Sequence, residues 1–325
     1  MTSTTVLYIS IGMSRKPCVD YPQTPQKGQI FLDHVAWFVP DMNGAGRAFE
    51  RLGFSLTPFV AQNNADPGGG PPVPAGTGNR CAMLRRGYLE ILSAVEGIDT
   101  PLVRQLDTAL DRYKGVHLIA FSIADPEAEY ERLENMGFSP QDPVYLRRPL
   151  VADGKEQGEV AFTVLRVPPL LMKEGRIQML RQETPDLVWE ENLLARENGV
   201  SALAAVLLAV ENPGETASRF SRFTGKAAVG DKDYFTIELD RGRIAIMGQS
   251  RCLDLLPGTS LPKLPYMAAI VLESPDPTLS ASYFCNRGVL CNVAPNGILQ
   301  VDATDSEGTS LVIVKEGVFW PPRTC

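Results

Sequence analysis

The stretch 31-FLDHVAWFVPDMNGAGRAFERLGF-54 decides the fold, because its pattern returns in 115-GVHLIAFSIADPEAEYERLENMGF-138. Each copy opens with an apolar run typical of a buried strand and continues with an aspartate that can cap an amphipathic helix. A glycine and a phenylalanine then follow the helix, as expected of a helix C-terminus. The aspartate lies thirteen residues before the phenylalanine in both copies. The two stretches therefore predict one structural unit that occurs twice.

Shorter strand patterns follow each helix, and they close in 87-GYLEILSAVEG-97 and 175-GRIQMLRQETP-185. The closing segments align glycine with glycine and Glu90 with Gln178. A third copy starts at 203-LAAVLLAVENPGETASRFSRFTG-225 and a fourth at 267-MAAIVLESPDPTLSASYFCNRGV-289. Each unit thus reads as a strand, a helix and about three strands.

The repeats predict an α+β protein of four βαβββ units, arranged as two pairs. We expect an N-terminal extension at residues 1–29, as an extra strand or a tail, a first pair at 30–184, a connector at 185–199 and a second pair at 200–325. A chain of 325 residues exceeds the usual size of a single core, which also favours repeated units.

The two histidines of the chain, His34 and His117, occupy the first strands of the first two units. An alignment through them needs one gap, since His34 precedes Asp41 by seven residues and His117 precedes Asp125 by eight. A lone histidine in an apolar strand is more often a hydrogen-bonded core residue than a ligand. Two at matching repeat positions favour a shared metal site. In the third and fourth units, Ala205 and approximately Ala268 stand in their place.

Paired units that open with LDHVAWFVPD and close with YLEIL resemble the vicinal oxygen chelate superfamily, which includes glyoxalase I, methylmalonyl-CoA epimerase and extradiol dioxygenases. More narrowly, TGNR, YLEIL and RIQMLRQETPDLVWEENLLARENG resemble the glyoxalase-like domain proteins over about residues 30–200. The resemblance implies two curved sheets that face each other and hold a divalent metal ion between them. The implied ligands are His34, Glu90, His117 and Gln178.

Imidazole nitrogen and carboxylate oxygen are common ligands of Fe, Mn, Co, Ni and Zn ions. Strand alternation sends Glu90 to the face opposite Leu89 and Ile91, and an unpaired carboxylate inside the sheet would be costly. Glyoxalase I usually has glutamate where this chain has Gln178. Glu90 is therefore the candidate catalytic base, with Gln178 as a fourth ligand or a substrate hydrogen bond.

Several other residues are candidates for substrate contacts. Asn79 and Arg80 precede a strand whose end lies near the site in related proteins, and an arginine suits a substrate carboxylate or phosphate. A surface position explains Arg80 equally well, and Arg147 and Arg148 are weaker candidates. The segment 60-VAQNNADPGGGPPVPAGTG-78 is interpreted as a mobile loop over the cavity or a disordered insertion.

Composition limits the partners. A formal charge of -7 and an isoelectric point near 5.1 argue against nucleic acid and anionic membranes, so a small-molecule substrate is expected. Six cysteines without a CxxC pair favour a reducing, cytoplasmic compartment. The second pair of units would be structural, cover the cavity or mediate homodimerisation.

Three functions are consistent with these features. The first is a metal-dependent lyase or isomerase of the glyoxalase type, in which the metal ion stabilises an enolate or a similar oxyanion. The second is an Fe(II)-dependent, extradiol-type ring-cleaving dioxygenase, which needs two histidines and one carboxylate. The third is a non-catalytic protein that binds a small molecule, as resistance proteins of this superfamily do.

Overall fold

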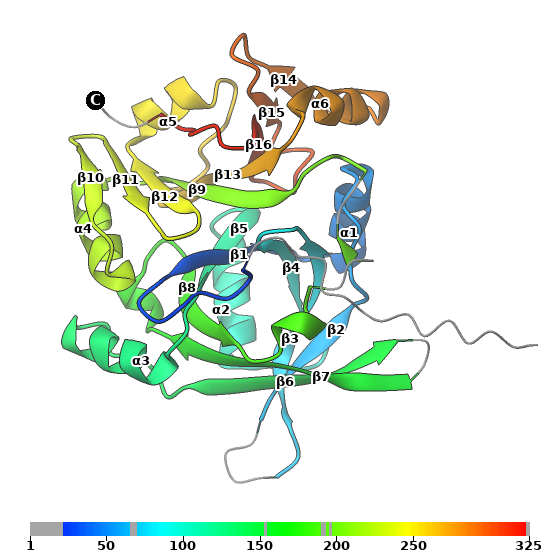
Figure 1. The fold of residues 1–325 in the computed structure, drawn as a ribbon, viewed down its shortest axis with the longest axis vertical. Helices are drawn as coiled ribbons and strands as arrows, with labels where there is room; N and C mark the ends of the chain where they lie inside the picture. Colours follow the sequence, from blue (N-terminus) through cyan, green and yellow to red (C-terminus); the bar gives the residue numbers. More distant parts are fainter. Residues whose placement is uncertain (1–21, 66–69, 153–154, 190–192, 195–196, 323–325) are drawn as a thin grey trace, which may run out of the picture.

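The structure is a computed structural model that describes residues 22–65, 70–152, 155–189, 193–194 and 197–322. Residues 1–21 of the expected N-terminal extension lie outside these residues. Among these residues, sixteen strands form two eight-stranded sheets and six α-helices accompany them, which confirms the predicted α+β class (Figure 1).

The first two units close into a barrel with the strand order β1-β4-β3-β2-β6-β7-β8-β5. The first unit consists of β1 (Phe31–Phe38), α1 (Met42–Arg51), β2 (Val60–Asn64), β3 (Val73–Met83) and β4 (Tyr88–Ala94). Helix α2 (Pro101–Leu110) leads to β5 (Gly115–Ser122), α3 (Pro126–Asn135), β6 (Val144–Ala152), β7 (Lys155–Arg166) and β8 (Arg176–Gln182) of the second unit. The 3₁₀ helices η1 (Pro169–Leu171) and η2 (Pro185–Leu187) flank β8.

The third and fourth units form an open sheet with the order β10-β11-β12-β9-β13-β16-β15-β14. It contains β9 (Ala202–Ala209), α4 (Pro213–Thr224), β10 (Ala228–Asp231), β11 (Tyr234–Glu238) and β12 (Arg243–Met247). Helix α5 (Gln249–Leu255) precedes β13 (Tyr266–Ser274), α6 (Pro277–Asn286), β14 (Cys291–Val293), β15 (Leu299–Val301) and β16 (Ser310–Lys315). In each half, the first strands of the two units pair antiparallel.

The helix that follows the first strand in each unit begins at a side-chain cap, as the repeat predicts. Asp41, Asp125, Asn212 and Asp276 each accept a hydrogen bond from a backbone amide in the first turn of their helix. These caps give four fixed reference points for aligning the units with one another.

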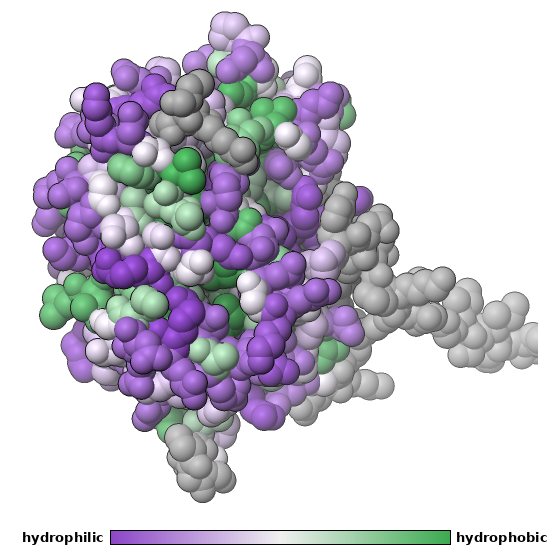
Figure 2. Space-filling view, turned by 60° about the vertical axis from the view of Figure 1, so that its left-hand side comes forward, coloured by the Kyte–Doolittle hydropathy of each residue, from purple (hydrophilic) through white to green (hydrophobic). Residues whose placement is uncertain are grey.

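The two sheets share one hydrophobic core. Leu32, Val35 and Trp37 of β1 belong to the same buried cluster as Val206 and Leu208 of β9. Polar contacts add to this packing, because Trp37 Nε1 donates to Ser306 O at 2.9 Å and Arg86 pairs with Glu273. The outer surface is mixed, and Figure 2 shows hydrophilic side chains interleaved with small apolar patches on one face. The barrel is therefore backed by the second sheet, and its interior is left for a site.

The segment 60–78 differs from expectation. Instead of a loop it forms the arms of a β-hairpin, since β2 and β3 pair from Val60 with Asn79 to Asn64 with Val73. The tip, residues 66–69, lies outside the described residues. Within the described part of the chain, no helix has the length and apolar character needed to cross a membrane.

Candidate functional site

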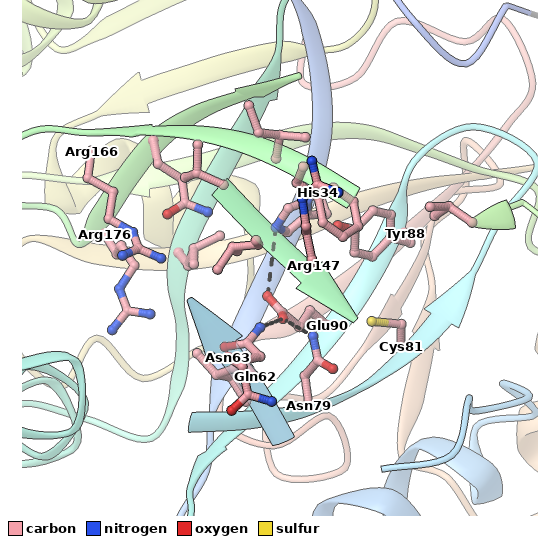
Figure 3. A pocket seen from close by; sticks show the side chains of 18 of the residues that line it. His34, Gln62, Asn63, Asn79, Cys81, Tyr88, Glu90, Arg147, Arg166 and Arg176 are labelled. Carbon is pink, nitrogen blue, oxygen red and sulfur yellow. Dashed lines mark hydrogen bonds and ion pairs between the residues drawn. The ribbon is translucent and has the colours of Figure 1, made fainter. Parts of the chain in front are cut away.

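A cavity lies inside the N-terminal barrel, and His34 on β1 opens onto it (Figure 3). Its volume is about 80 Å³, which gives room for several water-sized groups. His34 Nδ1 lies 2.7 Å from Oδ1 of the fully buried Asp33. Gln182 Nε2 donates to both oxygens of that carboxylate at 3.2 Å. Because an ionised carboxylate can only accept, Asp33 holds the proton on Nδ1 and leaves Nε2 toward the cavity.

Glu90 on β4 lies beside this imidazole and is 5% exposed. Its Oε2 atom is 3.7 Å from His34 Nε2. Its other oxygen, Oε1, accepts from Asn79 Nδ2 at 2.5 Å and from Gln62 Nε2 at 3.5 Å. The two amides fix the carboxylate, while Oε2 remains directed at the imidazole. Asp33, His34 and Glu90 thus form a chain of three groups that can each hold a proton.

The opposite wall of the cavity comes from β5, β7 and β8 and carries a different chemistry. Gln178, Arg166 and Arg176 line it together with Leu118 and Leu180. Gln178 Oε1 is buried and has no hydrogen-bond partner among the described residues. The strand register places Gln178 opposite Ala120 as it places Glu90 opposite Ala36, so the sequence alignment of Glu90 with Gln178 is correct.

His117 does not join the cavity that contains His34. It lines a second cavity, between α2 and the segment before β8, and it is fully buried. Its ring stacks on Tyr113 at 3.9 Å, and Nε2 donates to the Tyr113 carbonyl at 2.8 Å. Burial lowers the pKa of His117 to about 4. A neutral imidazole packed in this way is a core residue, so the expected convergence of the two histidines is wrong.

The reason for this error is a β-bulge. Where β1 pairs with β5, Ala36 lies opposite Leu118 and Trp37 lies opposite Val116, which leaves His117 as the extra residue. The residue equivalent to His34 is Leu118, because Leu118 pairs with Arg176 as His34 pairs with Tyr88. A shift of one residue along a strand sends a side chain to the other face of the sheet.

Only some of the residues predicted to contact a substrate line the cavity. Asn79 lines the cavity and binds Glu90. The neighbouring Arg80 does not line it, because its Nε donates to Thr57 O at 2.9 Å and its Nη2 pairs with Glu50 on α1 at 3.1 Å. Arg147 lies at the cavity and pairs with Glu159 at 2.7 Å. The side chain of Arg148 lies outside the described residues.

The four-residue metal site expected from the resemblance therefore does not form. Within the described part of the chain, no three His, Cys, Asp or Glu side chains are grouped as metal ligands. The cavity offers one imidazole and one carboxylate, with the amide of Gln178 across from them. Arg166 and Arg176 line the same space, and their positive charges oppose a divalent cation. This set of donors does not fit the ion.

Three charged residues of this site are not indicated by the sequence patterns. Asp33 occupies a bulge in β1, so alternation gives no indication that it reaches the His34 ring. Arg166 and Arg176 end β7 and begin β8, where a charged residue normally faces solvent. A signal was available in 175-GRIQMLRQETP-185, because Arg176 and Gln178 alternate with apolar residues and so share one face of the strand.

The C-terminal sheet has apolar residues at every position equivalent to His34 and Glu90. Ala205 and Ala245 occupy them in the third unit, and Ala269 and Val312 in the fourth. Sequence alignment thus identified Ala205 correctly and missed Ala269 by one residue. These side chains belong to a buried apolar cluster that includes Cys252 of α5, so apolar side chains cover this face of the C-terminal sheet.

Comparisons with known proteins agree with this architecture. The model of the glyoxalase-like domain family matches residues 32–224. No curated protein sequence matches the chain. A hypothetical protein from Staphylococcus aureus has a similar structure, with a TM-score of 0.62, 13% identity and coverage of 88% of this chain and 99% of the other.

Two further solved structures share the fold. A mutant of 4-hydroxymandelate synthase from Streptomyces coelicolor has a TM-score of 0.54 at 12% identity, and covers 91% of this chain and 95% of its own. A xylose isomerase-like TIM barrel/4-hydroxyphenylpyruvate dioxygenase fusion protein has a TM-score of 0.55 at 13% identity. That match covers 94% of this chain and 52% of the other. At such identities the likeness concerns the fold alone.

Proposed function

The chain belongs to the glyoxalase-like domain family, and we propose that its N-terminal barrel is an enzyme site of the isomerase or lyase type. The superfamily of this fold includes metal-dependent dioxygenases and lyases. The observation that carries the proposal is the buried chain Asp33–His34–Glu90 at the wall of the barrel cavity.

The proposed reaction begins with removal of a proton from a carbon next to a carbonyl or carboxyl group of a small substrate. Glu90 is the base, because two amides hold one of its oxygens and the other lies beside His34 at the cavity wall. His34 receives and returns the proton, since its ring lies between the carboxylates of Asp33 and Glu90. A buried carboxylate on Nδ1 fixes the imidazole tautomer and the orientation of the ring, as in hydrolase triads.

Two acid–base groups within 4 Å of each other suit a reaction that moves a proton between adjacent atoms. The enolate formed in between carries negative charge, and the guanidinium groups across the cavity supply positive charge to stabilise it. In this arrangement, side chains of the protein would perform the proton transfer and the enolate stabilisation expected of a glyoxalase-type enzyme. The second function expected from the sequence, ring cleavage by Fe(II), needs a second histidine where this cavity has Leu118.

The test is hydrogen exchange at carbon. The full chain is incubated in D₂O with pyruvate, with lactate or with the adduct of methylglyoxal and glutathione, and loss of the C–H signal is followed by proton NMR. We expect exchange above the buffer rate with at least one probe, and a loss of about 100-fold or more in Glu90→Gln. His34→Asn should lose a similar amount.

Arg181→Met is the matched control, because Arg181 is exposed on β8 and pairs with Glu183 outside the cavity. It should exchange at the wild-type rate. A wild-type rate equal to that of Glu90→Gln for every probe would refute the catalytic proposal. A protein that binds a probe without exchanging it would instead match the non-catalytic hypothesis.

A further inference from the structure

Two arginines form one wall of the barrel cavity. Arg166 is the last residue of β7 and Arg176 the first of β8, and both side chains line the space that contains His34 and Glu90. Figure 3 shows them next to each other, on the far side of the cavity from His34. Arg176 is 7% exposed, and its Cα–Cβ direction is fixed by the pairing of β8 with β5.

Neither guanidinium has an acidic partner among the ion pairs of the described residues. Arg166 Nε is buried and has no hydrogen-bond partner there. Arg176 donates to the side-chain oxygen of Gln105 at 2.8 Å and to the carbonyl of Leu102 at 3.2 Å, and both acceptors are neutral. Desolvation lowers the pKa of Arg166 to about 10 and that of Arg176 to about 9. Buried charge without a counter-charge is costly, and function commonly explains it.

Two other arginines of the chain, Arg219 and Arg147, show a contrast. Arg219 is also buried, and it pairs with Glu174 at 2.7 Å and with Glu215 at 2.9 Å. Arg147, at the same cavity, pairs with Glu159. Arg166 and Arg176 thus face the cavity without an ion pair among the described residues, and the only acidic charge that acts on Arg176 is that of Glu90, which lines the same cavity.

A second polar group marks the same wall. Gln178 pairs with Arg166 in the strand register, and its Oε1 atom is buried without a hydrogen-bond partner among the described residues. An amide oxygen accepts hydrogen bonds, so its missing partner is a donor such as a hydroxyl group. A ligand that satisfies the wall therefore needs an anionic group and a hydroxyl group close together.

We propose that Arg166, Arg176 and Gln178 form a subsite for a small hydroxycarboxylate, with the carboxylate on the two guanidiniums and the hydroxyl on Gln178. The inference rests on the proposed function and names its substrate class. A guanidinium binds a carboxylate through parallel hydrogen bonds, and exclusion of water strengthens the contact. The bound molecule would extend from this wall toward Glu90, which places the carbon beside the carboxylate nearest the proposed base.

The experiment measures binding by isothermal titration calorimetry with three probes. Lactate carries both groups, lactamide replaces the carboxylate by a neutral group of similar shape, and propionate lacks the hydroxyl. We expect lactate to bind at least tenfold more tightly than lactamide and several-fold more tightly than propionate. Inorganic phosphate is a fourth titrant, and binding tighter than that of lactate would overturn the assignment of a carboxylate.

Variants of the three residues test whether lactate binds at the proposed subsite. Arg166→Met and Arg176→Met should abolish the preference for lactate over lactamide, while Arg166→Lys should keep part of it because the charge remains. Gln178→Leu should remove the preference for lactate over propionate. Arg181→Met, with its exposed arginine on β8, should behave as the wild type. Equal affinities for lactate and lactamide in the wild type would overturn the subsite.

The two proposals can fail separately. Glu90-dependent exchange without a carboxylate preference would refute the subsite and leave the acid–base function in place. A carboxylate preference that disappears in Arg166→Met, together with no exchange beyond that of Glu90→Gln, would refute the acid–base function and leave the subsite.

Discussion

Replacing Arg166 by methionine is expected to stabilise the protein while it impairs the cavity. Burial lowers the pKa of this guanidinium from 12.5 to about 10, with desolvation as the cause. At about 1.4 kcal/mol per pKa unit, the charged side chain costs on the order of 3 kcal/mol in the fold. No hydrogen bond from its buried Nε offsets this cost within the described residues.

Methionine keeps most of the aliphatic stem of arginine and removes the charge, so little packing is lost. Because some solvent reaches the cavity mouth, we expect a net gain of about 2 kcal/mol in the free energy of unfolding, less than the full desolvation cost. For a chain of this size that gain corresponds to an increase of a few degrees in melting temperature. Urea unfolding and thermal unfolding, both followed by circular dichroism, measure the two quantities.

Arg181→Met is again the control and should change the free energy of unfolding by less than about 0.5 kcal/mol, since its arginine is exposed. Lactate should stabilise the wild type by mass action and should not stabilise Arg166→Met. A lower melting temperature for Arg166→Met would refute the reasoning, because it would mean that the guanidinium is compensated in the folded state.

Three further outcomes follow from the described geometry. The pKa of His117 is about 4 in the folded protein and 6.5 in the unfolded chain, so the unfolded chain binds a proton at this residue more readily. The free energy of unfolding should therefore be highest above pH 6.5 and fall by on the order of 3 kcal/mol as the pH drops toward 4. In His117→Gln, the free energy of unfolding measured with urea should depend less on pH across this range. Leu118→His should place a second imidazole in the barrel cavity and create Co²⁺ binding visible in the absorption spectrum, which the wild type and His117→Gln should both lack. Gly175→Ala should cost about 2 kcal/mol or more by urea unfolding, since its Cβ would lie 2.3 Å from a backbone oxygen, whereas Gly214→Ala meets nothing closer than 3.9 Å.

The fold could be predicted because its signals are local and repeated. Helix caps, apolar strands and terminal glycines recur at fixed spacings, and each alone is weak evidence. Four copies in order identify paired βαβββ units, and the four caps confirm the alignment. Closure of the first pair into a barrel and opening of the second into a sheet depend on edge pairing between β2 and β6, which leaves no pattern in the sequence.

The site could be predicted in part. Glu90, His34, Asn79 and Gln178 were identified and do line one cavity. The prediction of His117 is wrong, because it rests on aligning the two histidines of the chain with each other. Aligning His34 with His117 requires a one-residue gap, and this gap corresponds to the β-bulge at His117 in β5. An alignment without a gap pairs His34 with Leu118, since each lies seven residues before its helix cap.

The corrected alignment shows how the duplicated barrel divides its chemistry. In the first unit, the positions facing the cavity carry His34 and Glu90. The equivalent positions in the second unit carry Leu118 and Gln178, which cannot exchange protons in this way. The second unit instead places Arg176 where the first has Tyr88, and Arg166 where the first has Cys81. Under the two proposals, these two halves of the same geometry would provide a proton-transfer wall and an anion-binding wall. Because residues of both walls line one cavity of about 80 Å³, a small molecule bound in it would lie close to both.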